Sequence, residues 1–137
     1  MDISEFRRDM TAIEEGHWVT SEDLPDLGDI RVRVRGMSSG PARQMFDRMS
    51  TKVPSKDRNP GGSLRSEDVT RIMKTVLKKH LFMEVEGLTE GGKPLKADKV
   101  IERIDDPALE PLIELIIRAV SIVDARRESM TEDAAGN

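Results

Sequence analysis

The sequence predicts a mainly α-helical α+β domain, with four to five helices and one short N-terminal β-hairpin. Several segments repeat apolar residues at spacings of three and four, the period of an amphipathic helix. Aromatic residues make up only 3% of the chain, so aliphatic residues and Met must fill the core, which favours helices over a β-sandwich. Residues 29–35 alternate between apolar and charged side chains, as a half-buried strand does. We expect one domain over residues 1–126 and a disordered tail over 127–137.

The N-terminal third predicts a helix followed by the hairpin. Ile3, Phe6, Met10 and Ile13 recur at helical spacing over residues 2–15, and Gly16 ends the pattern. The hairpin covers about residues 17–35. In it, the short segment around Trp18 pairs with the alternating strand across a connection of about ten residues.

The middle of the chain predicts two helices separated by a loop. The first spans roughly 41–52, with Ser39 as its cap and Pro41 in its first turn. Two Pro and two Gly make residues 53–63 a loop. The next helix opens at Ser66, and we expect its buried stripe to consist of Val69, Ile72, Met73, Val76 and Leu77.

The C-terminal third begins with an alternating exit at 82–86, a break at Gly87 and a turn at 91–94. A short helix over 97–104 and a last helix over 107–125 follow. Apolar residues cover most of the circumference of the last helix, so it is either the central helix of the domain or a subunit interface. Its narrow polar stripe contains Glu114 and Arg118, in the correct order for a helical ion pair.

Charge and composition exclude several classes of protein. The net charge of −4 argues against a dedicated nucleic-acid binder. The absence of cysteine excludes disulfides and thiolate chemistry and fits a reducing compartment. The start of the chain does not have the pattern of a signal peptide, and charged residues interrupt the longest apolar segment, 108–123. We therefore expect a cytoplasmic protein that does not bind a membrane.

No residue pattern predicts an active site, so we expect a protein that is not an enzyme and binds no cofactor or metal. His17 and His80 are far apart in sequence and match no metal-binding spacing. The glycine pairs at 61–62 and 91–92 lack the spacing that cradles phosphates. Two basic surfaces remain: Arg31, Arg33 and Arg35 on the strand, and Arg71, Lys74, Lys78 and Lys79 on the third helix. Each is either a solvated surface or a site for an acidic protein segment.

The segment LFMEVEGLTEGGKPLKADKVIERIDDPALEPLIELI resembles the C-terminal half of the tail assembly chaperones of long-tailed, siphovirus-like bacteriophages. IEEGHWV and GDIRVRVRG are similar to the opening hairpin of that family. The resemblance covers about residues 12–125. The chain departs from the family in having Val85 where many relatives carry Trp, and in its additional N-terminal segment.

This resemblance implies a non-catalytic assembly factor in the host cytoplasm that is absent from the finished virion. It implies binding to the tape measure protein, recruitment of tail tube protein, and a tendency to self-associate. The alternative is a minor structural protein of the virion, such as a tail completion or connector protein. A small DNA-binding regulator that uses the arginine strand is a third possibility. The residues that we expect to contact the partner come from the last helix and the third helix: Leu112, Leu115, Ile116, Ala119, Ile122, Arg71, Lys74 and Lys78.

Overall fold

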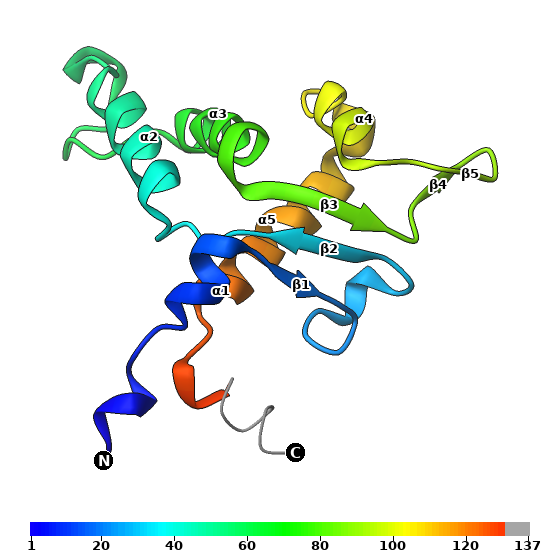
Figure 1. The fold of residues 1–137 in the computed structure, drawn as a ribbon. Coiled ribbons are helices and arrows are strands. Elements are labelled where there is room, and N and C mark those ends of the chain that lie inside the picture. Colours follow the sequence, from blue (N-terminus) through cyan, green and yellow to red (C-terminus); the bar gives the residue numbers. More distant parts are fainter. Residues whose placement is uncertain (131–137) are drawn as a thin grey trace.

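The computed structural model describes residues 1–130, and these residues form a three-stranded antiparallel sheet crossed by a long helix (Figure 1). The strands are β1 (His17–Val19), β2 (Arg31–Val34) and β3 (Phe82–Glu86), with β2 in the centre. Helix α5 (Glu110–Asp124) packs against β1 and β2. The domain is thus mainly helical with a small sheet, in agreement with the predicted α+β class.

The predicted hairpin is present but is only part of the sheet. Trp18 pairs with Arg33 and Val19 with Val32, so β1 is the partner of β2 as expected. The segment 82–86, expected only as an alternating exit from a helix, is a third strand. It pairs with the opposite edge of β2. Because β1 and β3 pair with its two edges, the alternating segment β2 is the central strand of the sheet.

The N-terminal helix predicted over residues 2–15 is interrupted. A 3-10 helix covers Ile3–Glu5, and the α-helix α1 covers only Met10–Glu15. Ile3 and Phe6 are exposed, whereas Ile13 is fully buried. The break occurs at Asp9, whose carboxylate accepts a hydrogen bond from the Ala12 backbone N–H at 3.1 Å and so starts α1 afresh.

Two helices lie beyond one end of the sheet and confirm the pair predicted in the middle of the chain (Figure 1). They are α2 (Gly40–Thr51) and α3 (Ser66–Val76), and a π-helical turn, Leu77–Leu81, extends α3 to β3. The hydroxyl of Ser39 makes no capping hydrogen bond at the start of α2. The predicted stripe on α3 is wrong at Val69, which is 40% exposed, because α2 covers only part of that helix.

A small hairpin joins β3 to the last two helices. Its strands are β4 (Thr89–Glu90) and β5 (Lys93–Pro94), and α4 (Ala97–Glu102) follows. Gly87 precedes the hairpin with a φ of +83°, and a Cβ there would lie 2.4 Å from the Asp29 carbonyl oxygen. Only glycine therefore allows β3 to leave the sheet this close to the end of the β1–β2 connection.

The last helix starts later than predicted, since a 3-10 helix occupies Pro107–Leu109 before α5 begins. Five of its side chains are buried: Ile113, Ile116, Ala119, Val120 and Val123. Of the two predicted roles, α5 therefore takes that of the central helix. The predicted pair between Glu114 and Arg118 is replaced, because Arg118 instead contacts the Asp26 carboxylate at 3.0 Å. Asp26 lies in a 3-10 helix, Pro25–Leu27, of the β1–β2 connection.

Of the tail predicted over 127–137, residues 127–130 contact the N-terminal segment, and residues 131–137 lie outside the described residues. The Glu128 backbone N–H donates to the Arg7 carbonyl at 2.9 Å, and the two side chains form an ion pair at 3.1 Å. The N–H of Asp9 also donates to the Arg126 carbonyl. The segments 7–9 and 126–128 thus lie side by side below α1 (Figure 1).

The helices exceed the predicted four to five. Within residues 1–130, the named helices are five α-helices, one π-helical turn and four 3-10 helices, of which the one not yet described is Ser55–Asp57. Residues 128–130 are also helical. Over residues 1–130, no helix combines the length and the hydropathy that a membrane span requires.

Candidate protein-binding surfaces

The structure separates the predicted partner-binding residues of α5 into two groups. Ile116 and Ala119 are fully buried in the core, so the expectation that they contact a partner is corrected. Their apolar character serves packing against the sheet. Leu112, Leu115 and Ile122 are only partly buried and flank the core. These three residues retain some exposed surface.

The basic residues of α3 differ in how much of their charge is available. Arg71 lies 3.3 Å from the Asp68 carboxylate on the same helix. Lys74 forms a 3.1 Å ion pair with Glu110, and its side chain is only 15% exposed. Lys74 therefore ties α3 to α5. Lys78 is exposed and remains available to a partner.

The arginine face of β2 is matched by acidic residues of β3. Arg31 contacts Glu86 and Arg33 contacts Glu84, each at 3.0 Å. The guanidinium of Arg31 also lies 4.8 Å from the centre of the Trp18 ring, within the range of a cation–π contact. Arg35 donates to the Glu14 and His80 carbonyls. The two carboxylates compensate the positive charges of Arg31 and Arg33, and the carbonyls hold the guanidinium of Arg35 in place. Both effects weigh against a DNA-binding role for the strand.

A concave surface with a volume of about 590 Å³ lies between α2 and α3. The C-terminal end of α2, the following loop and the first turns of α3 surround this α2–α3 cleft. Its residues are Met49, Lys52, Val53, Pro54, Asp57, Arg65, Glu67, Asp68 and Arg71. Arg71 is the only predicted partner-binding residue among them.

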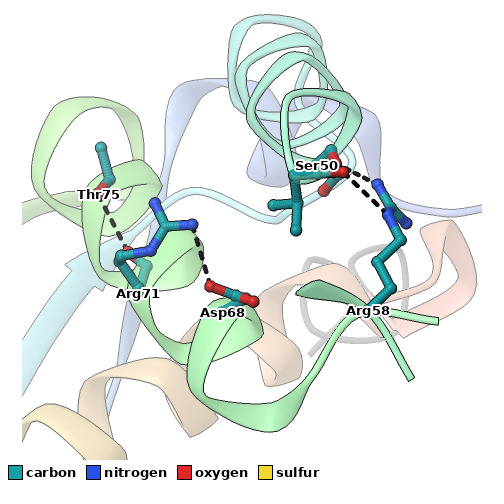
Figure 2. Close-up of polar contacts among 6 residues, drawn as sticks. Ser50, Arg58, Asp68, Arg71 and Thr75 are labelled. Carbon is teal, nitrogen blue, oxygen red and sulfur yellow. Dashed lines mark hydrogen bonds and ion pairs between the residues drawn. The ribbon is translucent and has the colours of Figure 1, made fainter. Parts of the chain in front are cut away.

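Arg58 fixes the loop that forms one wall of the α2–α3 cleft. Its Nε donates to the Val53 carbonyl at 3.1 Å, and its Nη1 donates to the Gly62 carbonyl at 3.1 Å. Its third nitrogen donates to the Ser50 carbonyl in the last turn of α2. Figure 2 shows this guanidinium beside the end of α2. Because the last carbonyls of a helix have no partner within it, the arginine caps α2 and holds the loop closed.

The opposite wall is the exposed side of α3. There the guanidinium of Arg71 points toward Asp68 (Figure 2). The Thr75 hydroxyl donates to the Arg71 carbonyl at 3.0 Å. Three cationic and three anionic side chains line the cleft together with Met49, Val53 and Pro54. An apolar strip with charges of both signs at its rim is typical of a protein-binding surface.

The residues that line the α2–α3 cleft include neither histidine nor cysteine, and its carboxylates are not buried. The two histidines of the chain lie elsewhere and are not brought together. His17 belongs to β1, where burial, aided by the positive charge of Arg126, lowers its pKa below the usual value of 6.5. Among residues 1–130, no group of three or more His, Asp or Glu side chains is arranged to hold a metal ion.

The sequence offered only an indirect signal for this cleft. The loop over 53–63 was predicted, and so were the helices on both sides of it. The loop forms a wall of the cleft because Arg58 holds it in place, and the three carbonyls that Arg58 contacts are separated along the chain. No residue spacing indicates such a guanidinium bridge.

Comparison with known proteins gives no further assignment: no protein family, curated protein or solved structure matches the chain significantly.

Proposed function

We propose that the protein is a tail assembly chaperone of a long-tailed bacteriophage. It binds a segment of the tape measure protein and helps recruit tail tube subunits, without catalysis and without entering the finished virion. Two observations support the proposal. One is the resemblance of residues 12–125 to that family. The other, which carries the argument from the structure, is the α2–α3 cleft with its apolar strip and charged rim.

The cleft suits a helical partner better than a small molecule. Met49 lines the cleft and is only partly buried, so part of its surface remains available to a partner. Methionine adapts its shape to different apolar surfaces, and grooves lined by it accept amphipathic helices. Lys52 and Asp57 at the rim can then orient the bound helix through charge.

The test is co-expression with the tape measure protein encoded beside the gene. The wild-type protein should keep the tape measure protein soluble and should co-purify with it. Met49→Glu places a charge in the apolar strip and should abolish both effects. Met130→Glu is the matched control, because Met130 is 52% exposed and lies outside the cleft. A wild-type protein that leaves the tape measure protein insoluble refutes the proposal.

Mass spectrometry of purified particles separates the chaperone from a minor virion protein. A chaperone should be absent from the particles, and its detection at a fixed copy number per particle supports the tail completion or connector alternative.

A further inference from the structure

The free edge of β3 is a second surface that could bind a protein, and it is separate from the α2–α3 cleft. Strand β3 is an edge strand, because only β2 pairs with it. Among the described residues, no backbone group outside β2 hydrogen-bonds to Met83–Glu86. A row of backbone donors and acceptors is therefore open to another strand.

A groove of about 540 Å³ runs beside this edge. Met83–Leu88 line one side of it, and the segment 94–98 that leads from β5 into α4 lines the other. Trp18 of β1 also lines the groove, so the groove extends from the edge of β3 onto the face of the sheet that carries Glu84 and Glu86. Leu88, Leu95 and Ala97 are partly buried apolar residues of the groove. The groove thus combines open backbone groups with apolar side chains, as sites that accept an added strand do.

The side chains of β3 specify the charge of the strand that fits. Glu84 and Glu86 lie on the same face of the sheet, and Val85 lies on the other. On its inner edge β3 already pairs with a basic–apolar–basic strand, since Arg31 opposes Glu86, Val32 opposes Val85 and Arg33 opposes Glu84. Each carboxylate already contacts an arginine of β2 at 3.0 Å but remains accessible to a second cation, since the side-chain exposure is 53% for Glu84 and 57% for Glu86. A second basic strand can reach them from the open edge.

The same charges argue against a second copy of this chain as the occupant. Two copies of β3 that pair antiparallel about a twofold axis place residues of the same face opposite each other. Glutamate then opposes glutamate at the centre of the interface, which is destabilising.

We propose that the open edge of β3 binds an extended protein segment in which basic residues alternate with apolar ones. The segment adds a fourth strand, antiparallel to β3. Its basic side chains contact Glu84 and Glu86, and its apolar side chains enter the groove beside Leu95 and Ala97. This site does not depend on the proposed function, because it shares no lining residue with the α2–α3 cleft.

The experiment titrates the isotope-labelled full chain with three synthetic peptides, followed by NMR. The first has the sequence GDIRVRVRG of residues 28–36. The second has the same composition with its three arginines adjacent, and the third replaces those arginines by glutamates. The alternating peptide should shift the amide signals of Met83–Glu86 and slow their hydrogen exchange. Two exposed ion pairs contribute roughly tenfold in affinity over the adjacent-arginine peptide, and the glutamate peptide should not bind.

Two variants test the location of the site. Ala97→Arg fills the groove without changing the sheet and should reduce the affinity of the alternating peptide by about tenfold or more. The control is Ala125→Arg, since Ala125 is exposed and lies outside the groove. Glu86→Gln keeps the shape of the side chain and should weaken binding several-fold, which maintains the test if Ala97→Arg does not fold. Equal affinity for the alternating and adjacent-arginine peptides, or unchanged exchange at Met83–Glu86, overturns the proposal.

Discussion

The sequence predicted that Ile116 contacts a partner, but the structure buries this side chain. We therefore expect its truncation to lower the stability of the fold. The side chain is fully buried in the middle of α5. Truncation to Ala removes buried methyl groups and leaves a cavity between α5 and the sheet, which should lower the free energy of unfolding by about 2–5 kcal/mol. Domains of this size are stable by about 5–15 kcal/mol, so the loss is a large fraction of the total. The midpoint of thermal unfolding should fall by about 8–20 °C.

Urea unfolding followed by circular dichroism measures this loss, with two variants for comparison. Ile116→Val should cost only about 0.5–1.5 kcal/mol, because one methyl group is removed. Leu115→Ala should cost clearly less than Ile116→Ala, since the neighbouring side chain is only partly buried. A loss below about 1 kcal/mol for Ile116→Ala, or one no larger than that of Leu115→Ala, refutes the assignment of Ile116 to the core.

Three further predictions concern a glycine, a histidine and an ion pair. Gly87→Ala should destabilise the fold by more than about 1 kcal/mol in urea unfolding, because a Cβ would lie 2.4 Å from the Asp29 carbonyl at a positive φ. A loss within experimental error contradicts this contact. Burial lowers the pKa of His17, so below pH 6.5 the unfolded chain binds more protons than the folded protein. The stability that results is complete above pH 6.5 and is lost as the pH falls through the lowered pKa. Urea midpoints from pH 7.5 to 5 should therefore fall less in His17→Gln than in the wild type, and parallel curves disprove the assignment. A double-mutant cycle of Lys74→Met and Glu110→Gln should give a coupling energy of about 0.5–1 kcal/mol, and zero coupling shows that the pair does not hold α3 to α5.

Local sequence patterns predicted most of the helices and the first hairpin, because these elements depend on residues close together in the chain. The helix from Ser66 and the pairing of Trp18 with the arginine strand were both confirmed. The N-terminal helix was wrong because helical spacing was counted across Asp9, which starts a new helix. The third strand was missed because the short alternating segment 82–86 directly follows a helix.

The candidate binding surfaces were less predictable, since they depend on which side chains remain uncovered after folding. Apolar residues on most sides of α5 indicated either a central helix or an interface. Only its packing against β1 and β2 showed that Ile116 and Ala119 are in the core. The charge of the arginine strand was evident from the sequence, but its compensation by Glu84 and Glu86 was not, because these residues are more than fifty positions away.

The sequence by itself thus determined the broad fold class, the position of the hairpin and the approximate positions of the longer helices, since periodicity and turn residues act over a few neighbours. The tertiary structure decided that β3 completes the sheet as an edge strand, that Lys74 pairs with Glu110 between two helices, and that a cleft forms between α2 and α3. The physical reason is that burial, ion pairing and strand pairing join residues distant in sequence, and no local pattern records which of them meet.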